Sequence, residues 1–143
     1  MNVVNYLLVT VFALTRATRA EGILVCGKQP IVGAYVRLFK AKSDELTDII
    51  ATTTTDSSGR FTIEGDTHSK EGLEAQIDPF LKFYHKCGDE EGKTGYRRFT
   101  LRYPRDFVHI GRSARNSYDV GVLNGQIKYP GESRQDSIPG VKV

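Results

Sequence analysis

The sequence predicts an all-β protein, a β-sandwich of seven or eight short strands with at most one short helical turn. Short strand-like segments alternate with turn residues between residues 22 and 123. No stretch of this region has the 3.6-residue period of an amphipathic helix. A closed barrel of the same strands is the alternative, because a period of two residues fits both architectures.

Eight segments have the alternation or the β-branched composition of strands. They are residues 22–26, 34–40, 48–55, 61–63, 77–87, 98–103, 107–110 and 118–123. The turn residues Asp56 and Gly59 separate two of them, so we expect 48–55 and 61–63 to pair as a hairpin. The polar stretch 66–76 is expected to be a loop or one short helical turn.

The segment 77–87 alternates most clearly. One parity contains Leu81, Phe83, His85 and Cys87, and we expect these side chains to face the core. His85 is then a buried histidine with hydrogen-bonded nitrogens, not a base or a ligand. The other parity contains Lys82, Tyr84 and Lys86, and we expect its lysines to face water.

Both ends of the chain differ from this pattern. Residues 3–14 form an uncharged apolar run, too short for a span of roughly 20 residues, which favours a signal peptide at 1–20 cut after Ala20. An uncleaved anchor or a buried first strand are the alternatives. The domain is then 21–123. Residues 124–143 are rich in Gly and Pro and poor in apolar residues, which predicts a flexible polar tail.

Composition narrows the function. Without Arg16 and Arg19, the formal charge falls from +3 to +1, which does not favour nucleic acid as a partner. Cys26 and Cys87 are an even pair, and in an oxidising compartment they have only one possible disulfide connectivity. Two buried free thiols are the alternative. The cysteines and histidines have no metal-ligand spacing, so we expect neither metal nor cofactor.

Several segments together are similar to a known family. They are GILVCGKQP at 22–30, VRL at 36–38, TDSSGRFTIEG at 55–65 and PFLKFYHKC at 79–87. Their order and spacing resemble the transthyretin-like proteins of nematodes, over roughly residues 22–122. The resemblance implies a prealbumin-like sandwich that is secreted and acts by binding, with a Cys26–Cys87 disulfide. Many members have a further cysteine after the His-x-Cys strand, and 88–96 has none here.

The resemblance also implies the kind of partner. Family members are thought to bridge an anionic phospholipid surface and a cell-surface receptor, or to carry a small hydrophobic ligand. The enzymatic relatives of the fold, the 5-hydroxyisourate hydrolases, end in Tyr-Arg-Gly-Ser, whereas this chain ends in Ile-Pro-Gly-Val-Lys-Val. We therefore expect no catalytic residues, and an extracellular binding protein without a membrane-spanning segment.

Positive charge gathers in one part of the sequence. Residues 82–115 have nine basic and four acidic side chains, a net charge of +5, whereas 21–81 has a net charge of −4. Strand parity places Lys82 with Lys86, and Arg98 with Arg102, on outward faces. If the two strands are neighbours, these four form one basic stripe, where each residue contributes about 1 kcal/mol to binding an anionic lipid surface. Ordinary solvated strand faces are the alternative.

Overall fold

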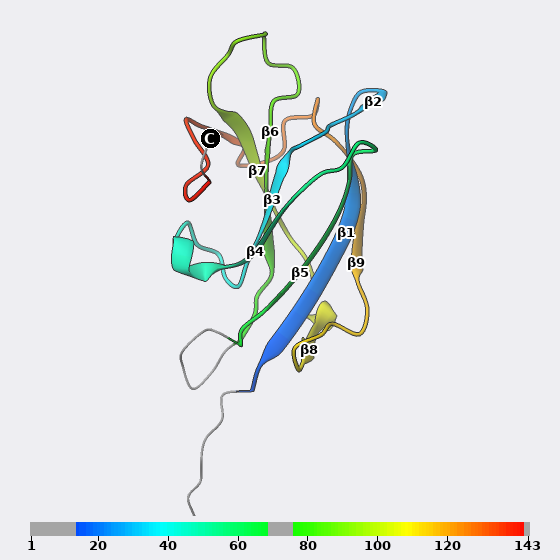
Figure 1. Cartoon of the computed structure of the whole chain (residues 1–143), viewed down its shortest axis with the longest axis vertical. Helices are drawn as coiled ribbons and strands as arrows, with labels where there is room; N and C mark the ends of the chain where they lie inside the picture. The colour runs from blue at the N-terminus through cyan, green and yellow to red at the C-terminus, as the bar shows by residue number, and fades with distance from the viewer. Residues whose placement is uncertain (1–13, 69–75, 142–143) are drawn as a thin grey trace, which may run out of the picture.

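Two β-sheets face each other in the computed structural model, which describes residues 14–68 and 76–141. The first sheet contains β1 (Arg16–Cys26), β2 (Gln29–Pro30), β5 (Arg60–Asp66), β8 (Val108–Ile110) and β9 (Tyr118–Asn124). The second has the order β10 (Ser133–Gln135), β7 (Tyr96–Arg102), β6 (Phe80–His85), β3 (Tyr35–Phe39) and β4 (Ile49–Thr54). This arrangement confirms the predicted β-sandwich (Figure 1).

Helical structure is restricted to two 3-10 turns in the described residues, Leu46–Asp48 and Arg105–Phe107. Most of the stretch 66–76, where the sequence predicts a loop or a helical turn, lies outside the described residues. The same holds for residues 1–13, the apolar part of the predicted leader.

β1 is the central strand of the first sheet. It pairs antiparallel with β5 on one edge, and with β8 antiparallel and β9 parallel on the other. The strand begins at Arg16, well ahead of the predicted 22–26, and Ala17, Thr18 and Ala20 are fully buried. The predicted cleavage position after Ala20 therefore falls inside β1. The residues of β1 that precede this position have the character of a buried first strand, one of the alternatives to a signal peptide.

The predicted hairpin of 48–55 and 61–63 is wrong. β4 pairs with β3 in the second sheet, whereas β5 pairs with β1 in the first. Thr55, the residue after β4, is buried, and its hydroxyl donates to the carbonyl of Ile31. Gly59 has a positive φ of 75° and packs on the carbonyl of Leu24. Residues 56–59 thus form a turn, as predicted, but this turn connects the two sheets instead of closing a hairpin.

The core lies between the sheets and is rich in aromatic rings. Phe83 stacks on Phe99 with a centroid distance of 4.7 Å, and Phe61 meets Phe83 edge to face at 5.4 Å. The Cys26–Cys87 disulfide is confirmed, and it joins the end of β1 to the residues just after β6. One covalent bond therefore links the two layers beside the aromatic core.

The outer face of the second sheet is covered over β3 and β6 instead of solvated. All residues of β6 are buried, including Lys82 and Tyr84, which the sequence places toward water. The C-terminal segment, predicted to be a flexible tail, instead forms β10 beside β7 and buries Ile138. Its few apolar residues gave little sign of this, because the pairing uses backbone groups and charged side chains.

His85 is buried in the core, as predicted, but only one of its ring nitrogens has a partner. Nδ1 accepts the backbone N–H of Cys87 at 3.1 Å, while Nε2 has no hydrogen-bond partner within the described part of the chain. Burial, and after it the charge of Arg97, lower the pKa of His85 to about 4 against smaller opposing effects of Glu132 and Asp89. The ring is therefore neutral at physiological pH.

This shift predicts a pH dependence of stability. The folded pKa of about 4 lies below the ordinary value of 6.5, so the unfolded chain binds the proton more tightly. Stability is therefore complete above pH 6.5 and falls by about 3 kcal/mol as the pH drops to 4. Urea unfolding across this range should show the loss, and His85→Gln should remove most of the slope. An equal slope in the variant would contradict the assignment to His85.

Candidate functional site

Lys82 lies at the middle of β6, on the outer face of the second sheet, with only 6% of its side chain exposed. Its ammonium lies 2.5 Å from Oδ1 of Asp44 and donates to the carbonyl of Ser43. The same ammonium sits 4.2 Å from the ring centroid of Phe39. The loop after β3 therefore closes over this lysine and neutralises its charge.

Arg98, on β7, uses the same carboxylate. Its Nη1 lies 3.2 Å from Oδ1 of Asp44, the oxygen that Lys82 also contacts. The hydrogen bond and charge of Lys82, with a smaller contribution from Arg98, hold the pKa of Asp44 below its usual value. One carboxylate thus serves two basic side chains.

Lys86 and Arg102, the other two residues of the predicted stripe, lie at opposite ends of the sheet. Arg102 pairs across the strands with Phe80, the first residue of β6, whereas Lys86 follows its last residue. Lys86 stacks over Tyr96 at 4.7 Å, and Arg102 bonds Asp78 at 2.9 Å. The structure thus does not bring the four residues together as one exposed patch.

Arg37 is the residue of this face that sequence reasoning missed. It lies on β3 directly opposite Lys82 on β6, and it is 4% exposed. Its Nε has no hydrogen-bond partner, and no carboxylate of residues 14–68 or 76–141 forms an ion pair with its guanidinium. The alternation in 34–40 places Arg37 on the outward face of its strand, and this parity is the sequence feature that could have pointed to it. Nothing in the sequence predicts that the outward face is covered at this position.

A cavity of about 300 Å³ lies over Arg37, and we call it the Arg37 cavity. Its floor is formed by the sheet, with Phe39, Tyr84 and Arg98 among the lining residues. Asp44 and Leu46 line one side. The C-terminal segment forms the other wall through Gln135 and Pro139.

Arg97 anchors this C-terminal segment. Its Nε and Nη2 bind the two carboxylate oxygens of Glu132 at 3.1 and 2.8 Å. Nη1 donates to the carbonyls of Cys87 and Gly125 at 2.8 and 2.6 Å, and Nη2 donates to that of Ile127 at 3.2 Å. A bidentate pair with both partners largely removed from water is the strong form of this interaction. The segment is thus fixed on both sides of residue 130.

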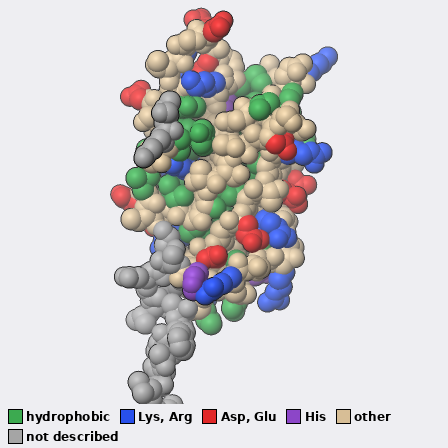
Figure 2. Space-filling view, in the orientation of Figure 1, with side chains coloured by type: hydrophobic (Ala, Val, Ile, Leu, Met, Phe, Trp, Pro, Cys, Tyr) green, Lys and Arg blue, Asp and Glu red, His purple; other side chains and the backbone are tan. Residues whose placement is uncertain are grey.

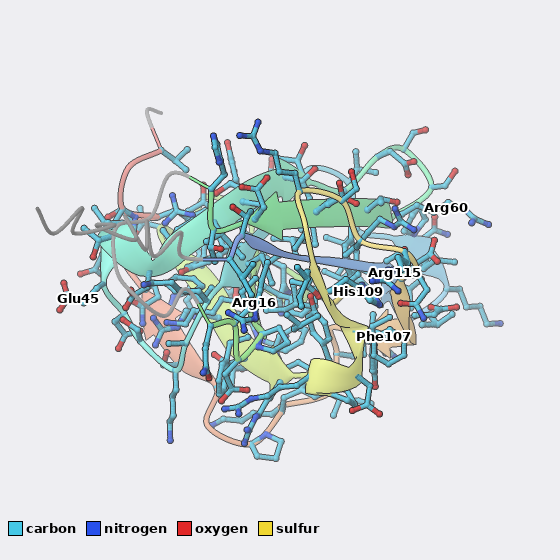
Figure 3. All side chains as sticks on the ribbon, turned by 90° about the horizontal axis from the view of Figure 1, so that it is seen from below. Arg16, Glu45, Arg60, Phe107, His109 and Arg115 are labelled. Atoms are coloured by element: carbon cyan, nitrogen blue, oxygen red, sulfur yellow. A yellow bond between two sulfur atoms is a disulfide. The ribbon has the colours of Figure 1, made fainter. Side chains whose placement is uncertain are left out.

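Exposed basic residues gather instead at the end of the sandwich around β8. We call this surface the β8 end and define it by Ile110, Arg112 and Arg115. Ile110 is 59% exposed, and both arginines are exposed. Arg112 lies 2.8 Å from His68, and the backbone N–H of Arg115 donates to His109. Basic, histidine and apolar side chains all appear at the lower end of the molecule in Figure 2, and Figure 3 shows the molecule from this end.

The family of the chain follows from comparison with known proteins. A model of the transthyretin-like family matches residues 21–104, more than half of the chain. This chain belongs to the transthyretin-like family. The match includes β1 from Glu21 onward, the turn after Thr55 and the His-x-Cys segment, the features on which the sequence resemblance depended.

Curated relatives agree with this family. Transthyretin-like protein 33 of Caenorhabditis elegans is 36% identical over 84% of this chain and 81% of its own length. Transthyretin-like protein 46 of the same species is 32% identical over 94% of this chain and 76% of its own length. Transthyretin-like protein 5 is 35% identical over 84% of each. These transthyretin-like proteins thus resemble the chain over most of its length.

Solved structures add little to the family assignment. A 9R-lipoxygenase from Cyanothece has a TM-score of 0.41 and 18% identity, covering 76% of this chain and 16% of the lipoxygenase. This likeness carries no conclusion about function. Among the described residues, no helix has the length and apolar character needed to cross a bilayer.

Proposed function

We propose that this transthyretin-like protein is a secreted, non-enzymatic binding protein that attaches to anionic phospholipid surfaces through its β8 end and presents its opposite end to a cell-surface receptor. The observation that carries this proposal is the exposed Ile110 close in sequence to two exposed arginines, Arg112 and Arg115. Neither arginine has a carboxylate partner within residues 14–68 and 76–141. Their charge is therefore available to an external anion.

The chemistry of the β8 end fits a lipid surface better than the predicted stripe does. Lys82 and Arg98 are already paired with Asp44, whereas Arg112 and Arg115 are exposed and have no carboxylate partner among the described residues. Basic side chains attract anionic headgroups, and an exposed isoleucine adds apolar contact at the headgroup boundary.

The opposite end of the sandwich has a different character. Beside the disulfide lies a hollow of about 420 Å³ with Pro30, Ile31 and Tyr96 among its lining residues. Val32 at its rim is 62% exposed. Such an apolar surface suits a protein partner. It is also where the alternative function, carrying a small hydrophobic ligand, would place that ligand.

Vesicle binding tests the attachment. Sedimentation with phosphatidylcholine vesicles that contain phosphatidylserine should show binding that weakens with added salt. The double variant Arg112→Ser and Arg115→Ser removes two charges worth about 1 kcal/mol each, so we expect affinity to fall roughly 30-fold. Ile110→Ser should weaken binding at both low and high salt.

The matched control uses two exposed basic residues at the other end of the sandwich. Lys28→Ser with Arg60→Ser changes the net charge equally, far from β8. Equal losses in the two double variants would mean that net charge alone drives binding. An unchanged affinity in the Arg112 and Arg115 variant would exclude the β8 end.

A further inference from the structure

We propose that the Arg37 cavity is a binding site for one small oxyanion, a carboxylate or phosphate group on a small molecule, enclosed between the second sheet and the C-terminal segment. The inference does not rest on the proposed function, because the cavity lies on a sheet face and not at the β8 end. It assigns a ligand chemistry to a buried side chain that has no hydrogen-bond or ion-pair partner among residues 14–68 and 76–141.

The first step is the unpaired charge. Arg37 is 4% exposed, and its buried Nε has no hydrogen-bond partner in the part of the chain that the structure describes. An arginine cannot lose its proton to escape burial, in contrast to a lysine. A buried charge without a partner is strongly destabilising, so proteins pair such groups. An anion in the cavity would supply the missing partner.

The second step is the excess of positive charge around the cavity. Arg37, Lys82 and Arg98 occupy neighbouring strands, and Asp44 is the one carboxylate among the residues that line the cavity. Lys82 and Arg98 both contact the same oxygen of Asp44. The cavity thus has two more positive than negative charges, which favours an entering anion.

The third step is the shape of the site. The planar guanidinium of Arg37 lies 5.9 Å from the centroid of Tyr84, and its fork suits a carboxylate or a phosphate. Phe39 also lines the cavity and offers a flat apolar wall. A volume of about 300 Å³ is at the small end of ligand pockets, which limits the occupant to a small molecule.

The C-terminal segment covers the site. A Cβ placed on Gly140 would lie 3.6 Å from Nη2 of Arg37, and Pro139 and Gln135 line the cavity. Asp44 and Leu46, on the other side, are both exposed, so this rim is the open side of the cavity. A bound anion would therefore sit against the segment, and its presence should tighten the segment on the sheet.

The test uses the protein with its C-terminal segment intact, purified in a buffer of large organic ions. The probes are inorganic phosphate, benzoate and hexanoate. Calorimetry measures their binding, and thermal melting measures their effect on stability. We expect at least one probe to bind and, at 100 times its Kd, to raise the melting midpoint by roughly 5–10 °C. The probe that binds identifies the phosphate or the carboxylate as the recognised group.

Arg37→Met should abolish this binding and, without probe, melt no lower than the parent chain, because it removes an unpaired buried charge. A merely structural arginine would instead lower the midpoint equally with and without probe, which would overturn the proposal. Should Arg37→Met fail to fold, Arg37→Lys keeps the charge but loses the fork, and we expect at least tenfold weaker binding. Unchanged binding in Arg37→Lys would also overturn the proposal.

Arg60→Gln is the matched control, since it removes an exposed arginine at the start of β5 and should leave probe binding unchanged. A chain that ends at Ser137 keeps Gln135 but lacks Pro139 and Gly140, which cover the Arg37 side of the cavity. If the probes bind the shortened chain but not the full chain, the protein's own C-terminal residues occupy the site, and the proposal is wrong. Vesicle binding should be unaffected by Arg37→Met, which keeps this test separate from that of the β8 end.

Discussion

A chain that begins at Glu21 is expected not to form the sandwich, whereas a chain that begins at Leu14 should fold. The shorter chain lacks Arg16–Ala20, which supply all the β1 partners of β8 and four of the seven β1 partners of β5. It also lacks three fully buried side chains, those of Ala17, Thr18 and Ala20. Deleting this half of the central strand exposes the core on that side.

The hydroxyl of Thr18 shows why the loss is large. It donates to the carbonyl of Phe107 at 2.8 Å, and since it has one hydrogen, it must accept the bond from Tyr103 at 2.7 Å. Tyr103 is 1% exposed, and burial raises its pKa to about 12. Leaving this phenol unpaired costs about 1–3 kcal/mol by itself. The lost strand pairing and the three lost buried side chains add to this cost, which is already a large share of the roughly 5–15 kcal/mol that stabilises a typical domain.

Two measurements check this prediction. Circular dichroism and urea unfolding of the two chains should give a cooperative transition only for the chain that starts at Leu14. N-terminal sequencing of secreted material should then find a first residue at or before Thr15, not Glu21. Cooperative unfolding of the chain that begins at Glu21 would contradict the role assigned to the first half of β1.

Replacing Arg97 by Gln should lower the free energy of unfolding by about 3–5 kcal/mol, because it leaves Glu132 as a buried charge without its partner. The side chain of Glu132 is 8% exposed and that of Arg97 is 16% exposed. The same substitution removes the bonds to the carbonyls of Gly125 and Ile127. The C-terminal segment should therefore loosen as well.

Urea unfolding measures the first effect, and hydrogen exchange of residues 126–141 measures the second. The control is the double variant Arg97→Gln with Glu132→Gln, which has no leftover charge and should recover part of the lost stability. A loss below about 1 kcal/mol in the single variant would show that the pair is not buried in solution. Arg105, whose side chain is 61% exposed and lies 3.4 Å from Asp78, offers a comparison, and Arg105→Gln should have a small effect.

Most of the fold could be predicted from the sequence, because the strands follow a period of two residues. Val36 and Leu38, or Phe99 and Leu101, reveal their inward face through alternation. Pairing partners were harder, since a turn such as Asp56–Gly59 has the same residues whether it closes a hairpin or crosses between sheets. The start of β1 was missed because Arg16 and Arg19 interrupt its apolar residues, as they would in a leader.

The candidate sites were less predictable, for a physical reason. Parity shows which residues point away from the core, but it does not show what covers them. Lys82 and Arg37 therefore had the appearance of solvated residues, and only the three-dimensional position of Asp44 and the C-terminal segment reveals their burial. The β8 end was missed because Ile110 and Arg112 belong to a short strand and a loop with no repeating pattern.

The position of β1 also determines the order in which the fold can assemble. This strand is the first to be synthesised, yet two of its partners, β8 and β9, lie near residues 110 and 120. Contacts that are distant in sequence form slowly, because a long loop must close before they stabilise anything. One edge of β1 can pair as soon as β5 has been made, whereas the other must stay open until nearly the whole chain is available, and this interval is when a chaperone would be needed most.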